Sequence, residues 1–400
     1  MTAIYSDAQI DDIKRRTDIV KVAGELGAVL RLSGGKHKGS CPMCGGGKSA
    51  TRFEIVDTGW VCAVCPAGGD VIELVRRATG CSFAQAVDRL GGTRVLSPDE
   101  ERQLEQDRKD HALKEDQKKE TYRLKELNAA MRIWNRGHVP GYNGVVMRYL
   151  ASRGLALPKS AIIREHDELG YYHGTTAGAN GETLPRAIHH GPAMVAALVG
   201  NDGAQRGVHI TFLLKDGSGK VKLADPETGE MLPAKKMRGS KAGCHIVLRQ
   251  GVVIHRLFIA EGIETCLSVA TALHKAGKLL AGDAFWAAGD LGNLGGPHAK
   301  TVLHSSLLTA SGRPQRIPGP EPADDGRAIA IPDSVHTLVL LGDGDSEPEL
   351  TAHTMERAKR RYHKPGRAIA VVPAPKGVDF NDIIQGKWVP APVLQELEPA

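Results

Sequence analysis

The sequence predicts a multi-domain protein of mixed α+β and α/β class. Three observations support this prediction. Two C-x-x-C pairs lie near the start of the chain, a long charged stretch without glycine or proline follows Pro98, and two apolar runs in the last part of the chain are each followed by acidic residues. A chain of 400 residues allows two or three domains. We expect a zinc ribbon over residues 1–97, a charged helical linker over 98–136, a basic α+β subdomain over 137–250 and a metal-binding α/β domain over 251–390.

The four cysteines of the two pairs predict a structural zinc site. Seventeen residues separate the pairs, a spacing typical of a four-cysteine zinc ribbon, and the ligands are Cys41, Cys44, Cys62 and Cys65. Each pair places two thiolates on one turn, and two turns complete a tetrahedron with no open position. Two disulfides are the alternative. The start of the chain, with Ser6, Asp7 and Gln9, lacks the apolar run of a secretory signal, so we expect a reducing cytoplasm.

Basic and aromatic residues accompany these cysteines. The lysines allow two interpretations: they balance the charge of the thiolates, or they form a cationic face for phosphates. Phe53 and Trp60 either stack on bases or pack in the core of the ribbon. The candidate phosphate-binding lysines are Lys36, Lys38 and Lys48.

The central region predicts a short helix over Val145–Leu150 and two strands, Ala193–Val199 and Val208–Leu214, joined by a turn. A basic cluster follows within 234–242. It is either a flexible cationic loop or a loop that holds nucleotide or template phosphates, and its candidate residues are Lys235, Lys236 and Arg238.

Two apolar runs in the last part of the chain end in carboxylates. Leu257–Ala260 precedes Glu261, and Thr337–Leu341 precedes Asp343 and Asp345. Acids at the carboxyl ends of parallel strands lie where α/β sheets bind ligands. Carboxylate oxygens suit Mg²⁺ or Mn²⁺. The alternative is that these acids merely decorate strand ends, but this does not explain two acidic ends in matched topology.

Two regions resemble a known family. The ribbon cysteines with Lys48, Phe53 and the segments Gly68–Val75 and Gly80–Leu90 resemble the zinc-binding domain of DnaG-type primases, in which a histidine usually stands at the place of Cys44. The segments Ala260–Thr265, Trp286–Gly289 and Asp379–Asp382, with the D-x-D sequence, resemble the Toprim domain of phage- and plasmid-type primases. Pro348 departs from the usual glycine of that pattern. Proline can open a helix at its first turn, so the fold is not threatened.

The resemblance implies a DNA primase that synthesises short RNA primers on single-stranded DNA from ribonucleoside triphosphates, for phage, plasmid or mobile-element replication. It implies that Glu261, Asp343 and Asp345 hold catalytic Mg²⁺, with Asp379 and Asp382 as possible additional ligands; Glu261 could instead help to deprotonate the attacking hydroxyl. The alternatives are a Toprim-type metal-dependent nuclease and a non-catalytic zinc-dependent DNA-binding adaptor.

Charge and length bear on the partners. A net charge of +6 and an isoelectric point near 8.9 fit a polyanionic partner. No apolar stretch reaches the ~20 residues that a membrane span needs. Only eighteen residues follow Asp382, too few for a helicase-docking domain, so we expect a separate replicative helicase.

Overall fold

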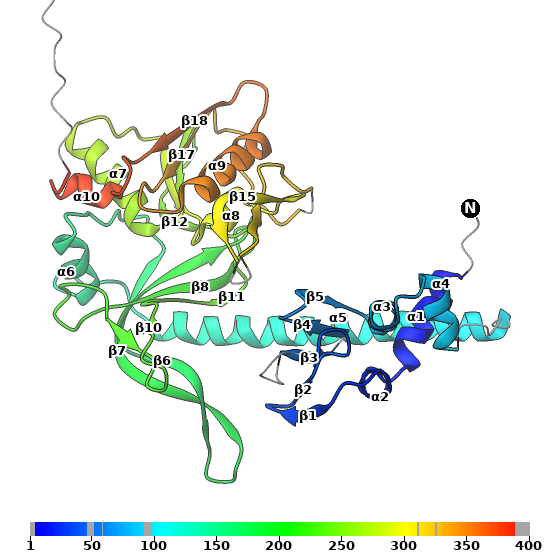
Figure 1. Ribbon diagram of the computed structural model, residues 1–400. Helices are drawn as coiled ribbons and strands as arrows, with labels where there is room; N and C mark the ends of the chain where they lie inside the picture. The colour runs from blue at the N-terminus through cyan, green and yellow to red at the C-terminus, as the bar shows by residue number, and fades with distance from the viewer. Residues whose placement is uncertain are drawn as a thin grey trace, which may run out of the picture. The chain divides into compact units, whose positions relative to one another are not determined.

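A computed structural model of the chain describes residues 5–45, 52–57, 59–91, 98–309, 312–324 and 326–388 (Figure 1). The chain divides into two compact units, one of residues 1–119 with 308–313 and one of residues 120–307 with 314–400. Helices and strands are mixed in both units, which confirms the predicted multi-domain fold with an amino-terminal ribbon.

The smaller unit contains a five-stranded antiparallel sheet in the order β1-β2-β3-β4-β5. Its strands are β1 Leu30–Ser33, β2 Lys36–Gly39, β3 Phe53–Val56, β4 Gly59–Cys62 and β5 Ala67–Gly69, and its helices are α1 Asp7–Arg16, α2 Ile19–Glu25, α3 Val71–Thr79 and α4 Phe83–Arg89. The amphipathic helix α3 begins at Asp70, whose side chain accepts a hydrogen bond from the Glu73 backbone. Its residues Ile72 and Leu74 join Phe53 and Trp60 in one buried core.

The charged stretch forms a single helix, α5 Pro98–Arg136, as predicted. The last turns of α5 are not solvated, because their apolar residues pack in a core. Ala130 is fully buried there, and Ile133 and Trp134 pack on the same apolar cluster as the central sheet of the larger unit. The return of apolar residues near Trp134 therefore marks the point at which the helix joins a core.

The larger unit begins with a four-stranded antiparallel sheet in the order β11-β8-β7-β6. Its strands are β6 Ile163–Ala177, β7 Thr183–Val199, β8 Gln205–Phe212 and β11 Lys235–Gly239, preceded by helix α6 Val145–Ser152. The predicted helix and the predicted pair of strands are confirmed. No sequence pattern marked β6 or the first ten residues of β7, because this hairpin is largely polar and exposed towards its tip.

The basic segment after this hairpin is strand β11, and the prediction of a loop there is wrong. β11 pairs with β8 along its whole length, from Lys235 opposite Thr211 to Gly239 opposite Gly207. Successive side chains of a strand point to opposite faces of its sheet. The basic residues of this segment are therefore divided between two faces.

A second sheet of the larger unit carries the predicted carboxylates. Its order is β12-β14-β13-β17-β18, with β12 antiparallel and the other strands parallel. The strands are β12 Ile246–Arg249, β13 Arg256–Ala260, β14 Asp283–Ala287, β17 Thr337–Gly342 and β18 Ala368–Pro373, and the helices are α7 Ile263–Lys275, α8 Leu291–Gly295, α9 Pro348–Tyr362 and α10 Phe380–Ile384. Two further strand pairs lie outside both sheets: β9 Leu223–Ala224 with β10 Met231–Leu232, and β15 Thr301–Leu308 with β16 Pro314–Pro318.

The two sheets of the larger unit share a core. One buried cluster contains Val146 of α6, Met194 of β7, Phe258 of β13 and Leu341 of β17. The basic subdomain and the α/β domain are thereby packed together, which fixes β11 and α6 next to the carboxyl ends of β13 and β17. Among the described residues, no helix has the length and apolar character needed to span a membrane.

Candidate active site and zinc centre

The four cysteines of the ribbon converge on one point. Their sulfur atoms all lie within 4.8 Å of one another, with Cys41 3.6 Å from Cys65 and Cys44 3.9 Å from Cys62. Four sulfurs around one zinc ion, each about 2.3 Å from the metal, stand about 3.8 Å apart, whereas a disulfide is about 2 Å long. Burial and the neighbouring thiols raise the pKa of Cys65, so a cation is needed to hold these sulfurs as thiolates. The donor set therefore fits structural zinc, and Cys44 takes its place within it.

Two basic residues of the ribbon are paired with an acid that sequence reasoning missed. Lys36 lies 2.6 Å and Lys38 lies 3.4 Å from carboxylate oxygens of Glu54 on the neighbouring strand β3. The side chains stay partly exposed, at 54% and 33%, so both ammonium groups remain within reach of an anion. Lys48 lies outside the described residues.

The two ribbon aromatics are core residues. Phe53 and Trp60 are 0% and 1% exposed, with ring centroids 5.6 Å apart. The Trp60 ring nitrogen donates a hydrogen bond to the Asp70 carbonyl, 3.1 Å away. Neither ring is available for stacking on a base, so of the two alternatives core packing holds for both residues.

The carboxylates of the larger unit lie on adjacent parallel strands. Ala260, which precedes Glu261, pairs with Leu341, two residues before Asp343. The two strand ends therefore meet at one edge of the sheet. Between Asp343 and Asp345, Gly344 passes so close to Pro375 that a Cβ atom there would lie 2.0 Å from the Pro375 carbonyl oxygen. Glycine is thus required for the turn that presents both aspartates.

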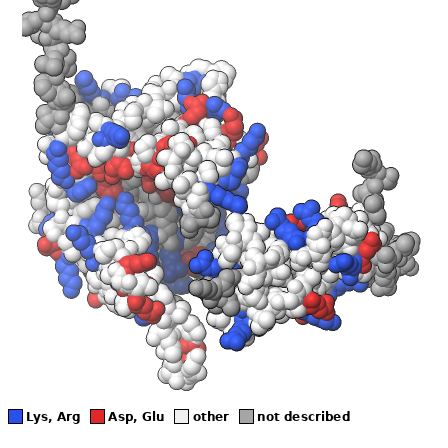
Figure 2. Space-filling model, viewed as in Figure 1, with Lys and Arg blue, Asp and Glu red and all other residues white. Residues whose placement is uncertain are grey.

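The charges at this edge repel one another. Burial, followed by repulsion from Asp345 and Asp379, raises the pKa of Asp343 to about 6, although hydrogen bonds of 2.9 and 3.1 Å from the Thr265 hydroxyl oppose the shift. Burial and Asp343 also raise the pKa of Glu261. Figure 2 shows acidic side chains gathered beside basic ones on this face of the larger unit. A partly buried group of carboxylates with an excess of negative charge is a suitable environment for a divalent cation.

Helix α10 places the two additional candidate ligands differently. Asp379 is the residue that caps this helix, accepting a hydrogen bond of 2.7 Å from the Asp382 backbone, and its charge acts on Asp343. The Asp382 carboxylate instead lies 3.0 Å from Lys387. Between them, the buried Asn381 donates hydrogen bonds to the carbonyl of Arg153, the residue that caps the end of α6, and to the Ser268 hydroxyl of α7.

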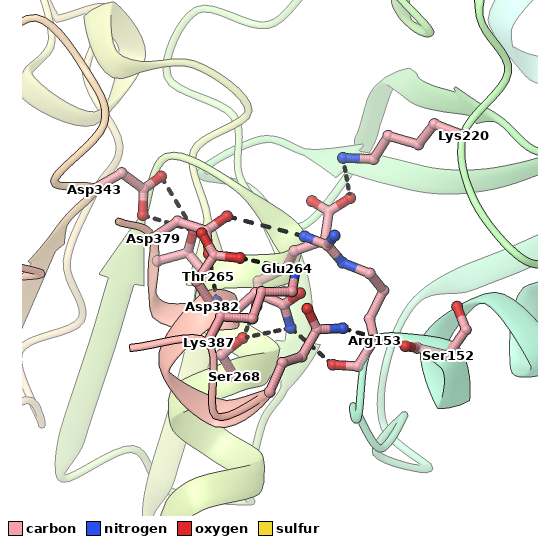
Figure 3. A network of polar contacts seen from close by, with 12 residues as sticks. Ser152, Arg153, Lys220, Glu264, Thr265, Ser268, Asp343, Asp379, Asp382 and Lys387 are labelled. Carbon is pink, nitrogen blue, oxygen red and sulfur yellow. Dashed lines mark hydrogen bonds and ion pairs between the residues drawn. The ribbon is translucent and has the colours of Figure 1, made fainter. Parts of the chain in front are cut away.

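Cations from three segments face the acidic edge. Glu264 of α7 is buried and accepts a hydrogen bond of 2.8 Å from the Tyr149 hydroxyl; the ammonium groups of Lys220 and Lys235 lie 2.7 and 3.4 Å from its oxygens. Arg153 lies 3.9 Å from Asp379 (Figure 3). Burial opposes ionisation of Glu264, but the two lysines outweigh burial and lower its pKa. Sequence reasoning identified Lys235 and missed the other members of this group.

The remaining predicted basic residues face the other side of β11. The Lys236 ammonium lies 4.0 Å from the Tyr171 ring centroid, and the Arg238 guanidinium lies 3.2 Å from Glu126 of α5. Both line a groove of about 620 Å³ between the end of α5 and the four-stranded sheet. Further cations in the lining are Lys125, Arg132 and Arg136.

Among the described residues there are two groups of potential metal ligands whose ligand atoms, within each group, all lie within 4.8 Å of one another. They are the ribbon cysteines and a group formed by His138, Glu165 and Asp167. The Glu165 oxygens in the second group accept hydrogen bonds from the first two backbone N–H groups of α6, which gives this carboxylate a structural role. Glu261, Asp343 and Asp345 are not among these close groups.

Comparison of the sequence with protein-family models matches residues 5–106 to the CHC2 zinc finger, the zinc ribbon of DnaG. Residues 125–248, from the end of α5 to β12, match a domain of unknown function, DUF7146. A search of curated proteins found no match.

Solved structures that match this chain in the search include several primases. A primase from Aquifex aeolicus with its zinc-binding and RNA polymerase domains is 15% identical over 95% of this chain and 83% of its own, with a TM-score of 0.26. The primase fragment of the bacteriophage T7 primase-helicase is 11% identical over 90% and 96%, with a TM-score of 0.29. A DNA primase domain from Pseudomonas aeruginosa is 10% identical over 66% and 75%, with a TM-score of 0.36. Likeness at this level carries no information about activity.

Proposed function

We propose that the chain is a DNA primase that joins ribonucleotides on a single-stranded DNA template. The observation that carries the proposal is the meeting of Glu261 with Asp343 at the ends of two adjacent parallel strands, in a chain that also bears a CHC2 zinc finger. The carboxylates offer hard oxygen ligands, and the cations facing them offer sites for phosphate oxygens. Nucleotidyl transfer requires both.

Glu261, Asp343 and Asp345 would hold Mg²⁺ or Mn²⁺, with Asp379 at the periphery. The metal would supply charge stabilisation while a 3′-hydroxyl attacks the α-phosphate and pyrophosphate leaves. Thr265 holds the Asp343 carboxylate through both of its oxygens and so limits its rotation. Lys220, Lys235 and Arg153 would bind the phosphates of the incoming nucleotide.

The groove lined by Lys236 and Arg238 is where we place the template. It is separated from the acidic edge by strand β11, whose Lys235 faces the carboxylates while Lys236 and Arg238 face the groove. Tyr172 and His190 line the groove together with its cations and offer rings for contacts with bases. Template and nucleotide would thus be held on the two faces of one strand.

The product of the reaction tests the proposal. The full chain is incubated with defined single-stranded DNA, all four ribonucleoside triphosphates with one labelled, and Mg²⁺, and the products are resolved by length. We expect labelled oligoribonucleotides that require template. Shortened DNA without new RNA would show a nuclease, and neither product in the presence of template binding would show an adaptor. Synthesis for phage, plasmid or mobile-element replication, with a separate helicase, is part of the same proposal.

A further inference from the structure

Glu264 is a buried acid of the larger unit that has two ammonium groups as partners. It lies in the first turn of α7, three residues after Glu261, and is 6% exposed. Its partners come from three separate segments: Tyr149 from α6, Lys220 from the loop after β8, and Lys235 from β11. The positive end of the helix dipole also favours a carboxylate at this position.

The number of charges exceeds what burial of one carboxylate requires. A single ammonium group would neutralise Glu264, and a buried ion pair contributes little to stability beyond that. The second ammonium gives the group a net charge of +1. The Lys220 and Lys235 side chains remain 32% and 39% exposed. The charge of Lys235 also acts on Glu261 and Asp343, so the surplus is open to a phosphate when those carboxylates hold a divalent cation. Arg153, 27% exposed, adds a further cation towards Asp379 (Figure 3).

We propose that Glu264 is a positioning residue that fixes the ammonium groups of Lys220 and Lys235 for the triphosphate of the incoming nucleotide. A free lysine side chain loses much conformational entropy when it binds a phosphate. Lysines already held by a buried carboxylate have lost most of it, so less of the binding free energy is spent on ordering them. This inference rests on the proposed function and deepens it, because a triphosphate site is needed for polymerisation and not for DNA hydrolysis.

A role limited to charge makes the opposite prediction. Changing Glu264 to glutamine raises the net charge of the group from +1 to +2 while it keeps the size of the side chain. If only the number of charges mattered, a triphosphate would then bind more tightly. If Glu264 positions the lysines, the two ammonium groups repel each other, move apart and bind the triphosphate more weakly. The sign of the change therefore distinguishes the two roles.

The test measures binding of α,β-methylene ATP with Mg²⁺ to the zinc-loaded full chain by calorimetry. For Glu264→Gln we expect the Kd to rise about tenfold, the size of one lost charge-assisted hydrogen bond. The Kd for AMP and for single-stranded DNA should change less than twofold. Glu264→Asp, which keeps the charge on a shorter side chain, should recover part of the affinity. An unchanged or lower Kd for Glu264→Gln overturns the proposal.

If the Glu264→Gln chain does not fold, the same change is tested in a chain that already carries Lys220→Gln. Lys220→Gln leaves Glu264 paired with Lys235 alone. Adding Glu264→Gln then replaces both members of the Lys220–Glu264 ion pair by neutral side chains of similar size, and the Lys235 ammonium, with its side chain 39% exposed, is left to water. If Glu264 positions Lys235, the double variant should bind the triphosphate more weakly than the Lys220→Gln variant does. Tighter binding by the double variant overturns the positioning role.

Measurements of triphosphate binding and primer synthesis by the wild-type chain distinguish a failure of this inference from a failure of the proposed function. A wild-type chain that binds no triphosphate and makes no primers overturns both. A wild-type chain that does both, alongside a Glu264→Gln variant with the same triphosphate affinity, overturns the positioning role and leaves the proposed function intact.

Discussion

Replacement of Cys62 by serine should unfold the ribbon and leave the larger unit folded. Cys62 and Cys41 are each 2% exposed and belong to the core that also contains Phe53 and Trp60. Zinc binding to such sites contributes about 10–16 kcal/mol of folding free energy. A whole domain is usually stable by only about 5–15 kcal/mol. The free energy lost with the metal is therefore about as large as the whole free energy of unfolding of the ribbon.

Hydrogen exchange on the full chain measures this directly, with zinc content measured in the same sample. In Cys62→Ser we expect amides of β3, β4 and α3 to lose protection, while amides of β13 and β17 keep it. Cys81→Ser is a matched control, because Cys81 lies in the same unit outside the zinc cluster. A zinc-free Cys62→Ser chain in which the ribbon amides stay protected would refute the reasoning.

Three further predictions follow from the two units. Changing both Lys36 and Lys38 to alanine should weaken binding of single-stranded DNA and reduce the slope of log K against log salt by up to about two, one for each phosphate that is no longer neutralised; an unchanged slope would leave these lysines with Glu54 alone. Burial lowers the pKa of His245 to about 4, below the ~6.5 of an unfolded histidine, so its contribution to stability is complete above pH 6.5 and is lost as the pH falls towards 4, by up to about 3 kcal/mol. His245→Gln should therefore flatten the pH dependence of urea unfolding over that range, followed by fluorescence of Trp286, whose ring stacks 3.7 Å from His245; an identical dependence in both chains would contradict this. Gly344→Ala should abolish primer synthesis with little effect on DNA binding, because the added Cβ meets the Pro375 carbonyl; normal synthesis would show that the turn can shift.

Local patterns were sufficient to predict several features. The spacing of Cys41 to Cys65 predicted the metal cluster, because each pair needs only its own turn. The runs before Glu261 and Asp343 predicted strands, and the structure places them side by side in parallel. Pro348 opens α9 at its first turn, as expected from its fixed backbone angle.

Features that depend on distant partners were not predictable in this way. Glu264 belongs to the segment Ala260–Thr265, but no local pattern shows that it pairs with Tyr149, 115 residues away, or with Lys220. Pairing of Lys36 with Glu54 depends on the register of β2 against β3. The segment from Lys235 was expected to be a loop because its residues are basic, but pairing with β8 makes it a strand.

Primer synthesis by Asp343→Asn tests the central claim most directly, since the change removes a charge from the acidic edge and hardly alters side-chain size. We predict a loss of about a hundredfold or more, from the several kcal/mol attributed to metal-ion catalysis, with template binding unchanged. Asp345→Asn and Glu261→Gln should behave alike. Asp333→Asn is the matched control, because Asp333 is 90% exposed and paired with Lys364. Synthesis by Asp343→Asn at the wild-type rate would contradict the assignment of the active site.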